Sequence, residues 1–263
     1  MIMLMDKNLL KATEDYWTRR ADGYSKVNQE ELTGVQHTNW KQFLVKEIEK
    51  TYPGHQPSDI HILDIGCGPG FFSAILAECG YAVTAIDYTQ VMLKEAKDNA
   101  ATCGVQDKIR FLQMDAQALT FADTSFDVVV SRNLTWNLQE PAVAYKEWCR
   151  VLKKGGLLLN FDANWYGYLF DEKKRQAYEE DRKNTQELGV EDHYVGTDID
   201  AMERIAYQMP LSPVQRPTWD EAVLKEAGVQ SVSSRQDIGS MLLSEVEQIN
   251  YAATPIFMVR AEK

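Results

Sequence analysis

The 263-residue chain has little cysteine and no long apolar run, and each shortage excludes a class of protein. Its four cysteines lie far apart without a CxxC pair, which argues against a zinc site and against a disulfide framework. No apolar run approaches the roughly 18 residues of a membrane span. The N-terminus is apolar for only five residues and has no small-residue cleavage site, so we expect a cytoplasmic protein without a membrane span.

Basic residues are also in short supply. The chain has 28 lysines and arginines against 39 aspartates and glutamates, a formal charge of -11. This sign is wrong for a surface that neutralises a phosphate backbone. The longest basic clusters, Lys153-Lys154 and Lys173–Arg175, are short and lie in acidic surroundings. We therefore expect no nucleic-acid partner and favour a small-molecule substrate.

From residue 60 onward, short β-rich runs alternate with helix-like runs. This order predicts an α/β fold, in which parallel strands are joined by helices on both faces of the sheet. Two β-rich runs close to the C-terminus, at 229–238 and 255–263, have a connection short enough to make them antiparallel neighbours. The strands expected are 60–65, 81–87, 109–115, 127–133 and 157–164, followed by these two, which gives seven.

The chain outside this alternation predicts additional helices. Residues 1–50 read as a helical segment rich in aromatic residues, and we expect it to form a lid on a domain that spans 51–263. After the fifth strand, two charged helices and a proline-rich loop predict an insertion at about 164–217, which would complete the lid. Thr218 and Glu221 fit a capping box at the start of the next helix.

A glycine turn follows the first strand in the stretch HILDIGCGPG. A glycine-rich turn between a strand and a helix lets a ligand approach the backbone closely. The spacing is G-x-G-x-G, with Phe71 where a dinucleotide fingerprint needs its third glycine, and no G-K-[ST] follows as in a P-loop. The turn therefore lacks the expected features of a phosphate site.

The stretch DIGCGPG resembles the first motif of class I S-adenosylmethionine-dependent methyltransferases, and SFDVVVSRN and RVLKKGGLLL resemble later motifs of that family. The resemblance is strong over about residues 60–164 and is closest to the ubiquinone, menaquinone and sterol methyltransferases. It implies a Rossmann-like fold with a seven-stranded, mostly parallel sheet. It also implies S-adenosylmethionine as cofactor and S-adenosylhomocysteine as product.

The resemblance implies roles for residues at the ends of three strands. Gly66 and Gly68 would admit the amino acid end of the cofactor, Asp87 its ribose hydroxyls, and Asp115 with the amide of Ala116 its adenine. Asp64 would orient the turn or accept from the cofactor's ammonium. The full set expected to bind the cofactor is Tyr16, Arg20, Tyr24, Asp64, Gly66, Cys67, Gly68, Gly70, Asp87, Tyr88, Met92, Asp115, Ala116, Ser131 and Arg132.

Methyl transfer from a sulfonium is an in-line displacement that depends mainly on proximity and desolvation, so no nucleophilic triad is needed. Polar and aromatic residues after strands four and five would meet a flat or cationic acceptor. This substrate set is Asn133, Trp136, Asn164, Trp165 and Tyr166, although aromatics here also suit the underside of a lid. Asp162 and His193 are candidates for a general base, with His37 a weaker third.

Two other functions compete with a small-molecule methyltransferase. A catalytically silent protein that binds S-adenosylmethionine or S-adenosylhomocysteine, as a sensor or partner subunit, would keep the same motifs. A nicotinamide-dependent dehydrogenase shares only Asp87 and the fold, because its glycine spacing differs. The sequence leaves open the acceptor, the atom methylated and the oligomeric state.

Overall fold

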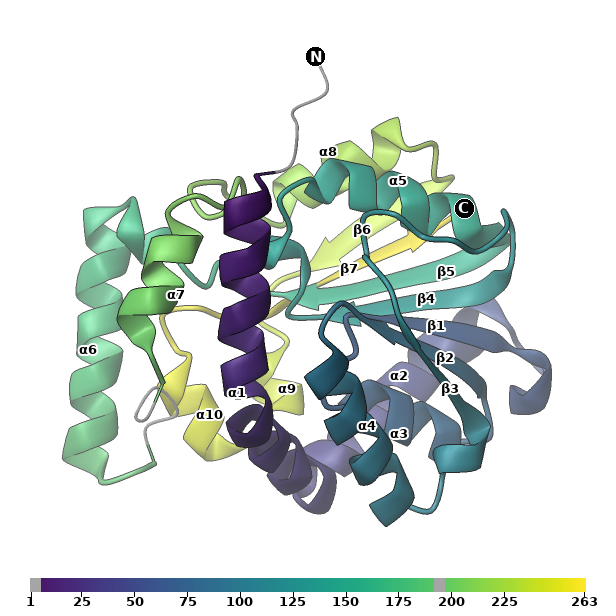
Figure 1. Ribbon diagram of the computed structural model, residues 1–263, viewed down its shortest axis with the longest axis horizontal. Helices are drawn as coiled ribbons and strands as arrows, with labels where there is room; N and C mark the ends of the chain where they lie inside the picture. The colour runs from purple at the N-terminus through teal and green to yellow at the C-terminus, as the bar shows by residue number, and fades with distance from the viewer. Residues whose placement is uncertain (1–5, 192–196) are drawn as a thin grey trace.

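The computed structural model describes residues 6–191 and 197–263, and these residues form one seven-stranded sheet. Its strand order is β3-β2-β1-β4-β5-β7-β6 (Figure 1). The strands are β1 (His61–Ile65), β2 (Ala82–Asp87), β3 (Ile109–Gln113), β4 (Phe126–Arg132), β5 (Leu152–Asp162), β6 (Ser231–Arg235) and β7 (Phe257–Glu262). The first five pair in parallel, whereas β7 is antiparallel to β5 and β6. This confirms the predicted Rossmann-like α/β fold.

The apolar sequence of the middle strands follows from their position in the sheet. Val128, Val129 and Val130 of β4 are all fully buried, although consecutive side chains point to opposite faces. A parallel strand covered by helices on both faces has this pattern. The helices on one face are α2 (Val35–Thr51), α3 (Phe71–Glu78) and α4 (Gln90–Thr102), and those on the other are α5 (Pro141–Val151) and α8 (Thr218–Glu226) (Figure 1).

The longest helix, α1 (Lys7–Thr33), crosses in front of the sheet, where it contacts α4 and α7 (Figure 1). It begins where Asp6 accepts hydrogen bonds from the amides of Asn8 and Leu9. The two helices expected between 164 and 217 are present as α6 (Glu172–Leu188) and α7 (Ile199–Ala206), and their assignment to an insertion stays a prediction. Two short helices, α9 (Gly239–Leu242) and α10 (Glu245–Asn250), precede β7.

The capping box expected at Thr218 and Glu221 is wrong. Helix α8 does begin at Thr218, but no side chain caps it. Glu221 instead accepts a hydrogen bond from the Ser234 hydroxyl of β6, 2.6 Å away. A capping box is present at Ser244 and Glu247, at the start of α10. Within the described ranges, no helix is both long and apolar enough to cross a lipid bilayer.

Candidate functional site

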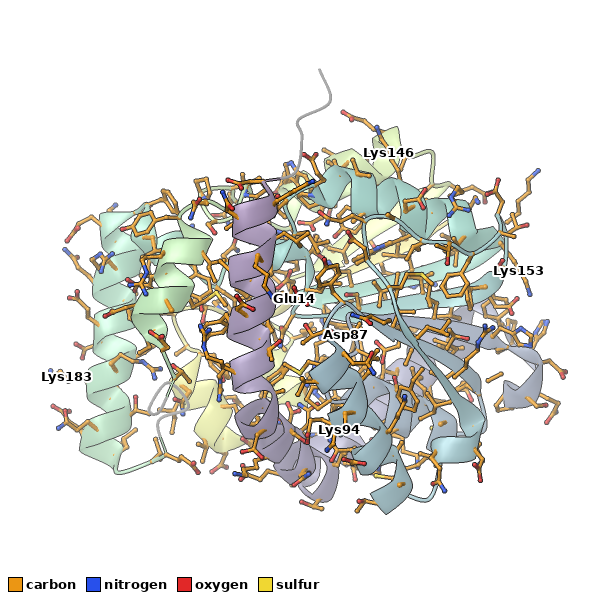
Figure 2. The ribbon with its side chains drawn as sticks, viewed as in Figure 1. Glu14, Asp87, Lys94, Lys146, Lys153 and Lys183 are labelled. Carbon is orange, nitrogen blue, oxygen red and sulfur yellow. The ribbon has the colours of Figure 1, made fainter. Side chains whose placement is uncertain are left out.

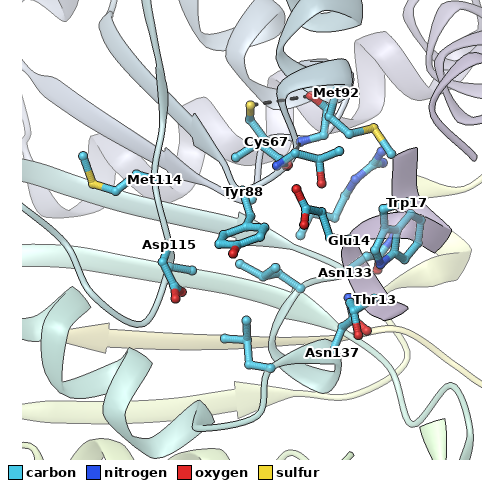
Figure 3. A pocket seen from close by; sticks show the side chains of 18 of the residues that line it. Thr13, Glu14, Trp17, Cys67, Tyr88, Met92, Met114, Asp115, Asn133 and Asn137 are labelled. Atoms are coloured by element: carbon cyan, nitrogen blue, oxygen red, sulfur yellow. Dashed lines mark hydrogen bonds between the residues drawn. The ribbon is translucent and has the colours of Figure 1, made fainter. Parts of the chain in front are cut away.

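A large cavity lies at the carboxyl edge of the sheet, between α1 and the ends of β1, β2, β3 and β4 (Figure 3). It contains about 1100 Å³ of space, its open mouth included. Ligands of open α/β sheets bind at this edge, beyond the ends of the strands. Side chains of Thr13, Glu14 and Trp17 reach it from α1, and Tyr88 and Asp115 face them from the strand ends (Figure 3).

The glycine turn forms one wall of the cavity. Gly66 and Gly68 have φ angles of 66° and 52°, the left-handed region that side chains rarely adopt. A Cβ atom on Gly66 would lie 2.6 Å from the Leu134 side chain, and one on Gly68 would lie 3.5 Å from the Tyr24 ring. Glycine is therefore needed both for the shape of this turn and for the room in front of it.

Asp87, at the end of β2, holds the turn in place. One of its carboxylate oxygens accepts a hydrogen bond from the amide of Gly68 at 2.9 Å, and the other accepts from the amide of Thr89 at 2.8 Å. Burial raises the pKa of Asp87, although both hydrogen bonds oppose the rise. The carboxylate thus fixes the backbone of the glycine turn and of Thr89, and it also faces the cavity.

Two further carboxylates line the cavity from neighbouring strand ends. Asp64 in β1 accepts a hydrogen bond from the Ser73 hydroxyl at 2.5 Å, and burial raises its pKa to about 6. Asp115 follows β3 and accepts from the backbone amide of Gln117 at 2.8 Å. The carbonyl of Ala116 accepts from the Trp148 indole at 2.9 Å, which fixes this loop to the core. The loop therefore has a defined shape beside the cavity.

The cavity is electrostatically negative. Its charged lining residues are Glu14, Asp64, Asp87, Asp115 and Arg132. Figure 2 shows Glu14 and Asp87 toward the middle of the molecule, whereas Lys146, Lys153 and Lys183 lie at its edges. A bidentate ion pair with Glu31, with distances of 2.9 and 2.8 Å, neutralises the Arg132 guanidinium. Glu14 pairs with Lys11 of α1 at 3.4 Å, whereas Asp64, Asp87 and Asp115 form no ion pair among the described residues. Three carboxylates therefore face the cavity without a cation, which favours a positively charged ligand over a phosphate.

Helix α1 places only one of its three expected cofactor residues at the cavity. Tyr24 lines it, but Tyr16 and Arg20 do not. Tyr16 is buried and packs against the edge of the Trp17 ring, with ring centroids 5.4 Å apart. The residues that sequence reasoning missed on α1 are Leu10, Thr13, Glu14, Trp17 and Asn28. These residues are spaced by three, four and seven positions, which places them on one face of a helix. The helical periodicity of the sequence could therefore have identified them.

Most expected cofactor residues do line the cavity. These are Tyr24, Asp64, Gly66, Cys67, Gly68, Asp87, Tyr88, Met92, Asp115, Ala116 and Arg132. Two others have structural contacts beside it. Gly70 begins α3 and lies against Ala96, and the Ser131 hydroxyl donates to the carbonyl of Ile65 at 3.0 Å, which joins β4 to β1. The remaining lining residues include the first two residues of α3 and others after the strands and helices: Phe71, Phe72, Thr89, Met114, Gln117, Leu134, Asn137, Leu138, Gln139 and Met209.

The expected substrate residues separate into two groups. Asn133 lines the large cavity and also a smaller chamber beside it, and Trp165 lines the smaller chamber. Trp136 and Tyr166 lie outside the large cavity and pack against each other, with ring centroids 4.9 Å apart. Asn164 lies outside both the large cavity and the smaller chamber, where it is hydrogen-bonded to the backbone of Arg216. The structure therefore does not place Asn164 where we expected it to contact a substrate.

The position of Asp162 corrects its expected role as a general base. Its side chain is fully buried and lines neither the large cavity nor the smaller chamber. It accepts hydrogen bonds from Arg216 at 2.6 Å, from the Trp165 indole and from the backbone amides of Trp136 and Ala163. A carboxylate held in this way shapes the loops after β4 and β5 but has no access to a substrate.

The histidine candidates are not at the cavity either. His193 lies outside the described residues. The His37 ring lies 2.8 Å from a carboxylate oxygen of Glu78, and this contact joins α2 to α3 away from the cavity. Among the described residues, no group of three or more His, Cys, Asp or Glu side chains is arranged to hold a metal ion.

Comparison with known proteins agrees with this geometry. Residues 63–160, which run from within β1 through the glycine turn to near the end of β5, match the family model of a methyltransferase domain. A demethylmenaquinone methyltransferase from Leptospira interrogans is 36% identical over 129 residues, 48% of this chain and 50% of that protein. A ubiquinone/menaquinone biosynthesis C-methyltransferase from Ectopseudomonas mendocina is 28% identical over 80% of this chain and 78% of that protein. Together these matches support a class I S-adenosylmethionine-dependent methyltransferase, through a domain that covers residues 63–160.

Solved structures agree on the fold. A Methanococcus maripaludis protein, proposed to be an S-adenosyl-L-methionine-dependent methyltransferase, superposes with a TM-score of 0.61 at 20% identity. The match covers 100% of this chain and 97% of that one, so the fold extends to α1 and the insertion. The chain spans about half the length of the first curated relatives it matches. The roles of the α1 and α10 residues that line the two cavities therefore rest on their contacts in this structure and not on these relatives.

Proposed function

We propose that this chain transfers a methyl group from S-adenosylmethionine to a small-molecule acceptor. The observation that carries the proposal is the negative cavity at the glycine turn, in which Asp64, Asp87 and Asp115 face a space that suits a cationic cofactor. When bound, S-adenosylmethionine supplies a methyl group on a sulfonium, which leaves as the neutral thioether of S-adenosylhomocysteine. The chain itself must hold the cofactor, align the acceptor and exclude water.

In this proposal, the strand ends bind the cofactor from one side and α1 covers it from the other. Gly66 and Gly68 leave room for its amino acid end, and Asp64 attracts its ammonium. Asp87 accepts from the ribose hydroxyls, and Asp115 with the amide of Ala116 binds the adenine. Burial of these groups between α1 and the sheet strengthens each interaction, because the local dielectric is lower than that of water.

The names of the relatives favour a hydroxylated aromatic acceptor. The Leptospira and Ectopseudomonas proteins are named for demethylmenaquinone and for ubiquinone and menaquinone biosynthesis. The reduced head groups of such quinones are flat rings with ionisable hydroxyls. We propose an acceptor of this class for this chain, and the aromatic residues beside the cavity support it.

The first experiment compares ligands by thermal shift. At about 100 times its Kd, a ligand adds about 2.7 kcal/mol and raises the Tm by roughly 5–10 °C for a chain of this size. We expect this shift with S-adenosylmethionine and S-adenosylhomocysteine but not with NAD. Release of S-adenosylhomocysteine in the presence of a hydroxylated aromatic would then demonstrate turnover. Binding without turnover across an acceptor series would favour the catalytically silent alternative.

A further inference from the structure

A second chamber adjoins the proposed cofactor cavity. It contains about 490 Å³ of space, its open mouth included, between α1, α2, the loops after β4 and β5, and helices α9 and α10. Its lining residues are Tyr24, Val27, Glu31, Trp40, Arg132, Asn133, Phe161, Trp165, Leu243, Glu247, Tyr251 and Ile256. Three of these, Tyr24, Arg132 and Asn133, also line the large cavity, so they form the partition between the two spaces.

The partition has an unusual backbone and a fixed position. Asn133 has a φ angle of 56°, which is uncommon for a residue with a side chain and typical of functional sites. Its side chain is hydrogen-bonded to the hydroxyl of Tyr24 on α1. The Arg132 guanidinium lies 4.4 Å above the ring of Phe71, where the ion pair with Glu31 holds it. The two spaces therefore adjoin at these three side chains, and an acceptor in the second space would meet the methyl carbon beside them.

One carboxylate in the chamber has no cation of its own. Glu31 neutralises Arg132, and the Asn28 side chain also donates to Glu31 at 2.8 Å. Glu247 faces the same chamber and, among the described residues, forms no ion pair. The hydrogen bond that its carboxylate accepts, from the Ser244 amide, is long at 3.4 Å. Glu247 therefore keeps the capacity to accept a proton from a bound molecule.

The surroundings of Glu247 tune it for this role. Burial and the nearby Glu31 raise its pKa to about 7, against the opposing effects of Arg132 and the hydrogen bonds with Ser244. The titratable and charged groups that line the chamber with it are Glu31 and Tyr24 from α1, Arg132 from β4 and Tyr251, which follows α10. A general base is most effective when its pKa is near the working pH. Glu247 is therefore half ionised close to neutrality.

The walls of the chamber suit a flat ring. Five of its lining residues are aromatic: Tyr24, Trp40, Phe161, Trp165 and Tyr251. Trp40 and Phe161 pack edge to face, with ring centroids 5.0 Å apart. The indole N–H of Trp40 is buried and has no hydrogen-bond partner among the described residues. A buried donor without a partner is costly, and an oxygen atom on a bound ring would satisfy it.

We propose that the second chamber binds the methyl acceptor, a hydroxylated aromatic ring, and that Glu247 takes up the proton of its hydroxyl group. This inference rests on the proposed function. The proton passes from the acceptor hydroxyl to a carboxylate oxygen of Glu247, and the freed electron pair forms the new bond to the methyl carbon. The electron pair of the broken sulfur–methyl bond stays on sulfur. Glu247 then returns its proton to water.

The test compares Glu247→Gln with Glu245→Gln in the full chain. Glutamine keeps the size of the side chain and can retain the capping box of α10, whereas Glu245 is exposed on the same helix. With a hydroxylated aromatic acceptor, we expect Glu247→Gln to lower kcat by about 10²- to 10⁴-fold. The Kd of S-adenosylmethionine should not change. The wild-type rate should rise as pH increases through about 7, and the variant should lose this rise.

A second variant tests the chamber independently of proton transfer. Leu243→Trp places a larger side chain in the acceptor chamber but not in the cofactor cavity. We expect the KM of the acceptor to rise about tenfold or more, with the Kd of S-adenosylmethionine unchanged.

The possible failures are distinguishable. Unchanged kcat and pH dependence in Glu247→Gln would overturn the role of Glu247, and an unchanged acceptor KM in Leu243→Trp would overturn the site. Methylation of small amines in place of hydroxylated rings would overturn the acceptor class. A wild-type protein that binds no S-adenosylmethionine would overturn the proposed function itself.

Discussion

Replacement of Asp87 by alanine tests the proposed cofactor site most directly. Its carboxylate accepts two backbone hydrogen bonds, from Gly68 at 2.9 Å and from Thr89 at 2.8 Å, while it faces the cavity. The alanine variant loses these bonds and the proposed bonds to the ribose. A hydrogen bond to a charged group contributes about 1.5–3 kcal/mol. Because 1.4 kcal/mol is a factor of ten, the Kd of S-adenosylmethionine should rise about 10- to 150-fold.

The assay is isothermal titration calorimetry with S-adenosylmethionine and S-adenosylhomocysteine. Asp98→Ala is the matched control, because Asp98 is exposed on α4 and its ion pair with Lys94 lies at the surface. Its Kd should equal that of the wild type. Thermal unfolding of both variants separates loss of affinity from loss of the fold. An unchanged Kd in a folded Asp87→Ala protein would refute the ribose contact and the role of this carboxylate at the turn.

Three further predictions concern the turn, the core and the pH dependence of stability. Gly68→Val should stay folded but lose cofactor binding, whereas Gly104→Val, with no atom within 4 Å of its Cβ, should only lower the Tm through backbone strain. Arg216→Met leaves two buried carboxylates unpaired and should cost about 3–5 kcal/mol in urea unfolding, unlike the exposed Arg204→Met. Burial raises the pKa of Asp64 from 3.8 to about 6, so the folded state binds more protons in this window. Stability should therefore fall as pH rises from 4 to 6, and Asp64→Asn should abolish that part of the fall.

The sequence predicted the centre of the site because its signals there are local. The glycine turn, Asp87 and Asp115 each lie at the end of a strand that its own apolar pattern identifies, and parallel strand ends meet at one edge. The same argument correctly brought Arg132 and Asn133 to this edge. Their placement needs only the order of the strands.

The remaining positions depend on contacts between distant parts of the chain. Glu31 and Arg132 are separated by 101 residues, and Asp162 and Arg216 by 54, so no local pattern pairs them. From the sequence alone, Asp162 resembles a general base, because the sequence does not reveal that Arg216 is its ion-pair partner. Glu247 lies on a helix of six residues that has little helical periodicity, and its place beside α1 follows only from the folded chain.

The ion pair between Glu31 and Arg132 reconciles two requirements of the proposed reaction. A free guanidinium at the partition would repel a cationic cofactor, because both charges would share a space of low dielectric. Glu31 removes this repulsion, and the aromatic rings below Arg132 keep its plane in position. Arg132 can then lie where the cofactor cavity and the acceptor chamber adjoin, as a neutralised side chain beside which the acceptor meets the methyl carbon. Asp64, Asp87 and Asp115 remain available to the cofactor, and Glu247 remains available to the acceptor.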